Sequence, residues 1–252
     1  MIENVYTNSD GTQTAKLCIP ENHTKLCVSV SSGTDSALVL YLVCSYITEH
    51  DRTGVEITAL HCVDLVRAPK SKPDFDLIID RFEKEFPNIK FVRRYIQFVE
   101  TETESKGSAI KRETAKIIAN IGIQSFFGGR TKNPPKEVCE SFGIPFPPAL
   151  VRREGENVPQ EHVLSMMDKY NKKTDNPDEC VVMISRFLGN VDRSFIAEYY
   201  NKIEFLKKLF PLTKSCISSD ILQTDGWRKP CMKCWWCKEK FWAFHQYDGG
   251  SL

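Results

Sequence analysis

Three cysteines near the C-terminus share one spacing. Cys231, Cys234 and Cys237 are each separated by two residues, and Cys216 lies in the Thr-Lys-Ser-Cys stretch upstream of them. Four thiolates in this pattern can close a tetrahedral zinc site that leaves no open position for catalysis. The spacing therefore predicts a structural Zn²⁺ site with Cys216, Cys231, Cys234 and Cys237 as ligands. Neighbouring lysines would offset the thiolate charge: Lys229, Lys233, Lys238 and Lys240.

Other interpretations of the cysteine cluster stay open. Cys234 and Cys237 alone could form a redox dithiol, and four cysteines could also hold an iron–sulfur cluster. His245 could replace Cys216 as the fourth ligand. The aromatic residues around the cluster could stack on a purine or an RNA base, or pack the metal segment onto the rest of the protein. These residues are Trp235, Trp236, Phe241, Trp242 and Phe244.

A second group with chemical potential is the hexapeptide Ser31-Ser32-Gly33-Thr34-Asp35-Ser36. Small residues and a helix N-terminus behind them favour the binding of a phosphate, and the hydroxyls of Ser31 and Ser36 add donors. Asp35 could order the loop or hold Mg²⁺ that enters with a nucleotide. Thr34 and Asp35 are both suited to cap the helix. An ordinary strand-to-helix turn is the alternative interpretation.

The elements that position this loop alternate between strand and helix patterns. A buried strand is expected at 26–30 and an apolar helix from the loop to about residue 50. The pattern continues with strands at 57–64, 89–98 and 124–127, and with helices at 75–86 and 108–122. This alternation predicts an α/β fold: a parallel sheet with helices on both faces and ligands at the carboxyl ends of the strands.

The later part of the chain is less regular. We expect a helix at 160–170, a last strand at 180–187 and a helix at 193–210. Six of the thirteen prolines fall between residues 133 and 159. They predict an irregular insertion, either a lid over the sheet or a plain surface loop. The expected organisation is an N-terminal extension (1–24), an α/β domain (25–190) and a helical C-terminal segment with the zinc knuckle (191–252).

Composition narrows the class of protein. The chain has 252 residues, 41% hydrophobic content and a net charge of +1, which argues against a disordered chain and a globally basic nucleic-acid binder. No apolar run approaches the ~20 residues of a membrane span, and the N-terminus lacks an export pattern. We therefore expect a cytoplasmic protein with reduced thiols. The other cysteines are expected in the core: Cys18, Cys27, Cys44, Cys62, Cys139 and Cys180.

The hexapeptide resembles the Ser-Gly-Gly-x-Asp-Ser loop of the PP-loop, or N-type, ATP pyrophosphatases, with Ser32 in place of the first glycine. The resemblance implies a Rossmann-like fold of the adenine nucleotide alpha hydrolase type. It also implies a loop that grips the β- and γ-phosphates of ATP, with Mg²⁺, while the α-phosphate is attacked. Pyrophosphate would leave, and AMP would remain on the substrate.

The C-terminal motifs resemble the zinc segment of the 7-cyano-7-deazaguanine synthase (QueC) family of queuosine biosynthesis. They are Thr213-x-Ser215-Cys216, the three clustered cysteines, and Phe241-Trp242-Ala243-Phe244. This resemblance implies a ligase that adenylates the carboxylate of a 7-deazapurine-like heterocycle, which ammonia then converts to an amide or nitrile. That family's segment after the second strand is replaced here by residues 61–67, and its deazapurine-binding segment has no counterpart in 128–150. Another heterocycle, amide or carboxylate therefore stays open as the substrate.

Further residues would complete such a site. Arg112 and Lys132 would join Ser31, Asp35 and Ser36 in catalysis, because cations stabilise the charge that develops on departing pyrophosphate. Arg130 lies beside Lys132 and could act in the same way. The nucleotide site would be lined, besides the loop, by His61, Asp64, Gly128 and Gly129. Simple solvation of these polar residues is the alternative.

Two other functions remain as alternatives. A tRNA-modifying PP-loop enzyme, acting by thiolation or amidine formation, would keep the ATP chemistry, and the stretch 202–240 has nine Lys/Arg against four Asp/Glu. A non-enzymatic zinc-bearing protein that binds nucleotides or nucleic acid would retain only a degenerate loop. No membrane partner is expected, and a homodimer stays open.

Overall fold

The computed structural model describes residues 2–65, 71–98, 106–144, 182–216 and 230–252. Its main sheet has five parallel strands in the order β5-β4-β3-β6-β7. The strands are β3 (Lys25–Ser29), β4 (Glu56–Asp64), β5 (Lys90–Phe98), β6 (Ser125–Gly128) and β7 (Met183–Ser185). The order reverses between β3 and β6, and the carboxyl ends of strands at such a switch point are where open α/β sheets bind ligands. The predicted α/β class is confirmed.

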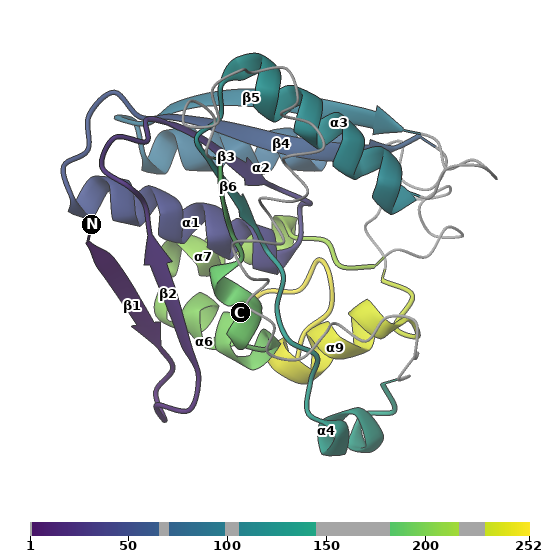
Figure 1. The fold of residues 1–252 in the computed structure, drawn as a ribbon. Helices are drawn as coiled ribbons and strands as arrows, with labels where there is room; N and C mark the ends of the chain where they lie inside the picture. The colour runs from purple at the N-terminus through teal and green to yellow at the C-terminus, as the bar shows by residue number, and fades with distance from the viewer. Residues whose placement is uncertain (1, 66–70, 99–105, 145–181, 217–229) are drawn as a thin grey trace.

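Helices cover both faces of the sheet. Helices α1 (Thr34–Glu49) and α2 (Ser71–Glu85) lie on one face, and α3 (Lys106–Ile121) lies on the other (Figure 1). Side chains of β3 alternate between the two faces, as a pleated strand requires. Leu26 and Val28 join the larger core with α1 and α2, whereas Cys27 joins the smaller core with α3.

The single helix predicted at 193–210 is wrong. The chain forms α6 (Arg193–Lys202) and α7 (Glu204–Leu209), followed by the 3₁₀ turn η4 (Phe210–Leu212). The break falls at Ile203, whose backbone is extended (φ −106°, ψ 112°). The strand predicted at 180–187 is also too long, because β7 ends at Ser185 and the 3₁₀ turn η3 (Phe187–Asn190) follows. Residues 180 and 181 lie outside the described residues.

Two elements were not foreseen. The N-terminal extension forms an antiparallel hairpin of β1 (Glu3–Thr7) and β2 (Thr14–Cys18), which buries Ala15 and Leu17 in the larger core. Helix α4 (Lys136–Ser141) occupies part of the region predicted to be irregular, and it begins directly after Pro135. The rest of that region and the helix predicted at 160–170 lie outside the described residues.

The last helix, α9 (Trp235–Phe244), packs beside α6. Phe244 lies in the larger core with Tyr200 and Phe210, with ring centroids 5.5 and 4.9 Å away. This contact joins the C-terminal segment to the face of the sheet that α1 covers. Across the described ranges, none of the helices is long and apolar enough to cross a membrane.

Candidate functional site

The loop 31–36 leaves β3 at the switch point and runs directly into α1 (Figure 1). The N-cap of α1 is Gly33, not Thr34 or Asp35 as expected, and no side chain caps it. The first N–H groups of a helix have no partner within it, so an uncapped start suits an anion. The Ser31 N–H donates to the Ser36 hydroxyl at 3.1 Å, and the two hydroxyl oxygens lie 3.2 Å apart. The structure thus brings the two predicted donors together.

Ser32 has the backbone conformation that glycine adopts easily. Its φ is 64°, in the left-handed region, which costs other residues about 1–2 kcal/mol. Its side chain is fully buried, and the hydroxyl has no hydrogen-bond partner among the described residues. The carbonyl oxygen of Ser32 accepts a hydrogen bond from the N–H of Lys214 at 2.8 Å. The departure from the PP-loop pattern therefore falls where a glycine would relieve strain.

Gly129 brings the end of β6 against the loop. A Cβ atom at this position would lie 2.8 Å from both the Cα and the N of Ser36, closer than real Cβ contacts. At Gly128 the nearest atom would be 4.0 Å away, on the flexible side chain of Phe126. Of the two glycines predicted to line the site, Gly129 is the one that the loop requires.

Asp35 is held by a buried ion pair rather than exposed to solvent. Its Oδ2 accepts from Arg193 at 3.1 Å and from Thr131 at 3.3 Å. Burial alone would lower the pKa of Arg193, but the carboxylates of Asp35 and Glu239 outweigh it and raise that pKa above its ordinary value. Glu239 forms an ion pair with the same guanidinium at 3.1 Å. These contacts support the loop-ordering role of Asp35 over that of a Mg²⁺ ligand.

The four predicted cysteines meet at one point. The sulfur atoms of Cys216, Cys231, Cys234 and Cys237 all lie within 4.8 Å of one another, and those of Cys231 and Cys237 are 3.8 Å apart. His245 is not among them: it ends α9 in a left-handed conformation with φ 53°. The structure therefore selects Cys216 over His245 as the fourth member of the group.

Backbone donors around the cluster favour thiolates. The N–H of Cys231 points to the sulfur of Cys216 at 3.4 Å, and that of Cys234 to the sulfur of Cys231 at 3.3 Å. Cys234 is also the N-cap of α9, where the helix dipole favours negative charge. Hydrogen bonds with Cys216 lower the pKa of Cys234 well below its ordinary value and raise that of Cys237 well above it. A group of four sulfur ligands in this environment suits a metal cation that binds thiolates.

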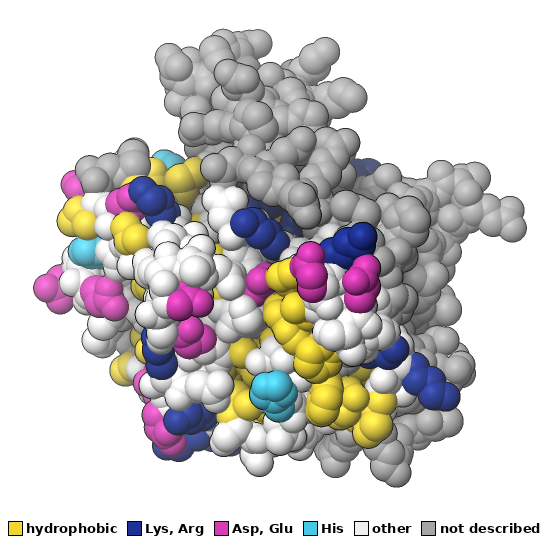
Figure 2. All heavy atoms as spheres, turned by 90° about the horizontal axis from the view of Figure 1, so that it is seen from below, with side chains coloured by type: hydrophobic (Ala, Val, Ile, Leu, Met, Phe, Trp, Pro, Cys, Tyr) yellow, Lys and Arg dark blue, Asp and Glu magenta, His cyan; other side chains and the backbone are white. Residues whose placement is uncertain are grey.

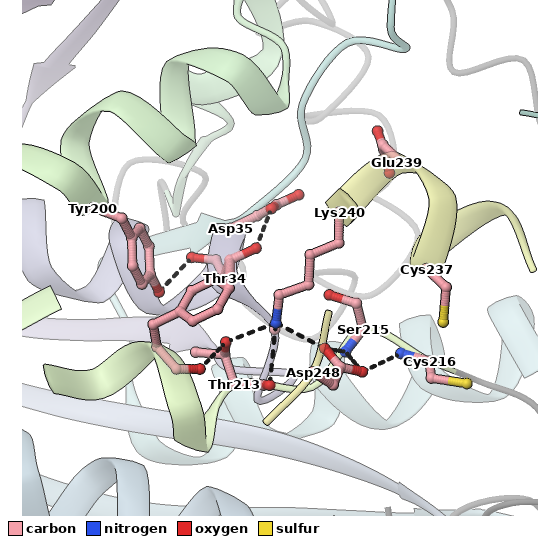
Figure 3. A network of polar contacts seen from close by, with 12 residues as sticks. Thr34, Asp35, Tyr200, Thr213, Ser215, Cys216, Cys237, Glu239, Lys240 and Asp248 are labelled. Carbon is pink, nitrogen blue, oxygen red and sulfur yellow. Dashed lines mark hydrogen bonds and ion pairs between the residues drawn. The ribbon is translucent and has the colours of Figure 1, made fainter. Parts of the chain in front are cut away.

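A buried lysine connects this cluster to the segment that contacts the loop 31–36 (Figure 3). Lys240 of α9 donates to Asp248 at 2.7 Å and to the hydroxyl of Thr213 at 3.0 Å. Asp248 in turn accepts from the backbone N–H groups of Ser215 and Cys216, each at 2.8 Å. Burial lowers the pKa of Lys240, and Asp248 counteracts part of that shift. The segment 213–216 thus touches the loop at one end and the cysteine cluster at the other.

Other predicted site residues lie elsewhere or stay untested. His61 is buried, and its ring nitrogens are engaged by the Val30 carbonyl (2.7 Å) and the Ser71 hydroxyl (2.9 Å), so it offers neither to a ligand. Burial lowers the pKa of His61, which keeps the ring neutral. Arg112 on α3 pairs with Glu113 at 2.9 Å. Asp64 is the last residue of β4. The backbone N–H of Lys132 donates to the Val191 carbonyl at 2.8 Å. None of these contacts involves a ligand, so the roles of Arg112, Asp64 and Lys132 remain predictions.

The aromatic residues of the metal segment mostly pack. Trp235 is buried with Cys139 and Ile144, and Trp236 and Trp242 pack against this group. Figure 2 shows hydrophobic side chains gathered on the face to which α4 and α9 belong. The exposed large hydrophobic residues of these segments are Phe142, Met232 and Phe241.

The remaining cysteines agree in part with the expected core positions. Cys27, Cys44 and Cys139 are buried, while Cys18 and Cys62 are half-buried. Cys180 lies outside the described residues. None of the cysteines that the structure describes forms a disulfide.

Sequence reasoning missed the charged residues that connect the two sites. They are Arg193, Glu239 and Asp248. Lys240 was expected only to offset the thiolate charge, whereas its ammonium group bonds to Asp248 and Thr213. One available signal was the composition of α9, in which three successive charged residues, 238–240, lie among seven apolar ones. Charged residues within such a helix cannot all reach water, and a buried charge requires a partner. No comparable signal marks Arg193 or Asp248.

No protein-family model matches this chain, and no curated protein matches it. Among solved structures, it is similar to the U34-tRNA thiolase NcsA from Methanococcus maripaludis with its 4Fe-4S cluster. The identity is 11%, the match covers 89% of this chain and 71% of that chain, and the TM-score is 0.43. A likeness of this size says nothing about activity or bound metal.

Proposed function

We propose that this chain is an ATP pyrophosphatase of the PP-loop type, which transfers AMP to an oxygen of its substrate and releases pyrophosphate. The observation that carries the proposal is the position of the loop 31–36. It lies at the switch point of a parallel sheet, at the uncapped start of α1, with Gly129 packed against Ser36. Binding of a polyphosphate at such a place follows from the first N–H groups of the helix, which have no partner within it, and from the helix dipole.

Each group of residues has a separate role in this proposal. The hydroxyls of Ser31 and Ser36 and the N–H groups at the start of α1 hold the β- and γ-phosphates. Asp35 fixes the loop through Arg193 and Thr131. A carboxylate oxygen of the substrate attacks the α-phosphorus, and the bond between the α-phosphorus and the bridging oxygen breaks to release pyrophosphate. Ammonia then attacks the activated carbonyl carbon, and AMP leaves.

For the cysteine cluster we propose a single Zn²⁺ ion. With Zn–S bonds of about 2.3 Å, tetrahedral geometry places sulfur atoms about 3.8 Å apart. The separation of 3.8 Å between Cys231 and Cys237 agrees with this value. In an iron–sulfur cubane each thiolate binds a different iron, which requires the sulfur atoms to lie farther apart. Four thiolates leave Zn²⁺ no open position, so its proposed role is structural.

The class of substrate rests on the two sequence resemblances. A heterocyclic carboxylate of the 7-deazapurine kind, with ammonia as the nucleophile, is the substrate that the C-terminal motifs favour. A tRNA nucleoside is the second candidate, because the 202–240 stretch is locally basic. Both substrates use the same adenylation step.

Purified protein with ATP, Mg²⁺, ammonium and a 7-deazapurine carboxylate is expected to form AMP and pyrophosphate in equal amounts. Ser36→Ala should slow this reaction by about 10²-fold, since it removes the hydroxyl that accepts from the Ser31 N–H and that would turn from the Gly33 carbonyl to donate to the phosphates. Separation of nucleotides by chromatography and a coupled pyrophosphate assay provide the measurement. Unmodified tRNA replaces the heterocycle in a parallel reaction, which decides between the two substrates.

Ser141→Ala is the matched control, because Ser141 is an exposed residue on α4 with its hydroxyl bonded to the Val138 carbonyl. It should leave the rate unchanged. Formation of ADP and phosphate, or an unchanged rate in Ser36→Ala, would contradict the proposed chemistry.

A further inference from the structure

Two arginines follow neighbouring strands at the same edge of the sheet. Phe127 of β6 pairs with Ser185 of β7 in parallel register. Arg186 comes directly after β7, and Arg130 lies two residues after the end of β6. Because parallel strands end at a common edge, both arginines lie at the edge from which the loop 31–36 also emerges.

Both neighbours of Arg130 in the chain contact the phosphate loop. Gly129 packs against the backbone of Ser36, and the hydroxyl of Thr131, which is buried, donates to Asp35 at 3.3 Å. The backbone of Arg130 is therefore fixed beside the loop. Its N–H donates to the Gly128 carbonyl at 3.1 Å, which closes a tight turn.

Arg186 is anchored just as firmly. Its carbonyl accepts from the N–H of Gly189 at 2.7 Å, and the next two residues, Phe187 and Leu188, are buried in the larger core. The side chain is partly buried. Burial lowers the pKa of Arg186 below its ordinary value, and the positive charge of Arg130 lowers it further.

Arg130 and Arg186 thus follow two strands that pair directly, so their positive charges lie on neighbouring parts of the same end of the sheet. Among the described residues, no carboxylate forms a hydrogen bond or an ion pair with Arg130 or Arg186. Arg130 is exposed and Arg186 is half-buried. Two other arginines with limited exposure have carboxylate partners: Arg193 lies between two carboxylates, and Arg93 contacts Asp76, Asp80 and Glu83. A half-buried guanidinium such as that of Arg186, next to a second cation, is unfavourable unless an anion joins the two.

We propose that Arg130 and Arg186 form a binding site for an oxyanion group of the second substrate, a carboxylate or a phosphate. This inference rests on the proposed function for its second substrate. The loop follows β3 and Arg186 follows β7, two strands away, which corresponds to about 10 Å at the usual strand spacing. An anion there lies beside the nucleotide phosphates and not among them. Guanidinium groups suit carboxylate and phosphate because their paired donors match two oxygens at once.

The test uses the metal-loaded full chain and inorganic phosphate as the probe. Thermal melting is followed as phosphate is added at constant ionic strength, with chloride as the balancing anion. Because the loop 31–36 also binds phosphate in the proposed function, the titration is repeated in Ser36→Ala, which removes a hydroxyl from the loop and leaves residues 129–131 unchanged. In that background phosphate is still expected to raise the melting temperature. The double variant that also carries Arg186→Gln should bind phosphate about tenfold more weakly than the background variant, since a charge-assisted pair of hydrogen bonds is lost.

Arg94→Gln in the same background is the matched control. Arg94 is an exposed arginine of β5, the outer strand of the sheet that lies farthest from β7. This variant should leave the phosphate response unchanged. Benzoate in place of phosphate shows whether a carboxylate binds equally well. The proposal is overturned if Ser36→Ala abolishes the phosphate response, or if Arg186→Gln and Arg94→Gln weaken it equally. Failure of the proposed function would appear elsewhere, as a lack of ATP binding by the wild-type protein.

Discussion

Arg193→Met is expected to lower the free energy of unfolding by about 3–5 kcal/mol, the usual cost of removing one partner from a buried ion pair. The guanidinium of Arg193 lies 3.1 Å from Asp35 and 3.1 Å from Glu239, and the three side chains are at most 10% exposed. Methionine has a similar length but no charge, so the two carboxylates would lose the cation that they share. Urea denaturation followed by circular dichroism measures the change.

The loss of Arg193 should also destabilise the loop 31–36. Asp35 lies in that loop, whereas Glu239 lies on α9, one residue before Lys240. Loss of Arg193 therefore removes a direct link between the loop and the metal segment. We expect Arg193→Lys to recover part of the stability, because it restores the charge but not both contacts.

Lys208→Met provides the comparison for an exposed pair. Lys208 lies 3.4 Å from Glu204, and both side chains are more than two-thirds exposed. Such pairs contribute about 0.5 kcal/mol or less, so this variant should melt as the wild type does. Equal stability of Arg193→Met and Lys208→Met would show that the buried network does not hold the fold together.

Removal of the metal is the second large effect. Cys216→Ser should abolish zinc binding and release the C-terminal segment, because structural zinc sites contribute about 10 kcal/mol or more in isolated fingers. Cys216 is linked through Asp248 and Lys240 to Thr213, and the next residue, Lys214, bonds to Ser32. The metal-free protein is therefore expected to lose ATP binding along with much of its stability. Elemental analysis, thermal melting and nucleotide titration measure these three properties.

Cys18→Ser separates this effect from the loss of any thiol. Cys18 is a half-buried free cysteine of β2, outside the cluster. It should retain about one zinc per chain, as expected for a single four-thiolate site. A Cys216→Ser protein that stays folded, binds ATP and melts with the wild type would rule out a structural metal. Iron with the visible absorbance of a cluster would instead identify an iron–sulfur centre.

The sheet and the cysteine cluster could be predicted from the sequence because their signals are local. An apolar run of strand length, a turn of small residues and an apolar helix specify β3, the loop and α1 without distant information. The two-residue gaps between Cys231, Cys234 and Cys237 are by themselves enough to predict that the three sulfur atoms share one metal ion. Cys216 was the favoured fourth ligand on the same basis, and the structure brings it to the other three.

The connections between sites could not be predicted because they depend on tertiary contacts. Asp35 and Arg193 are 158 positions apart, and nothing near either residue identifies the other. His61 shows the opposite error: a polar residue near a strand end suggested a ligand, yet its side chain stacks on Phe75 at 4.9 Å and bonds inside the core. The pattern shows which residues are polar, but only packing decides which of them face solvent.

The ends of helices and strands also depend on tertiary packing, which the sequence pattern does not show. The break at Ile203 has no glycine or proline to announce it, so the pattern continued through 193–210 as one helix. The hairpin β1–β2 was missed because its strands are short and partly exposed, with alternation too brief to stand out. Tertiary packing overrides weak local preference at both places.

Calorimetric titration of ATP with Mg²⁺ into the metal-loaded protein tests most directly that the loop 31–36 is a nucleotide site, because it needs no second substrate. The wild-type protein should bind with a dissociation constant in roughly the micromolar to millimolar range. Gly129→Ala should weaken binding by at least about tenfold, since its new methyl group meets the backbone of Ser36 and displaces the loop. Gly128→Ala, where the nearest atom is 4.0 Å away, should bind as the wild type does. No binding by the wild-type protein, or equal binding by the two alanine variants, would contradict the assignment.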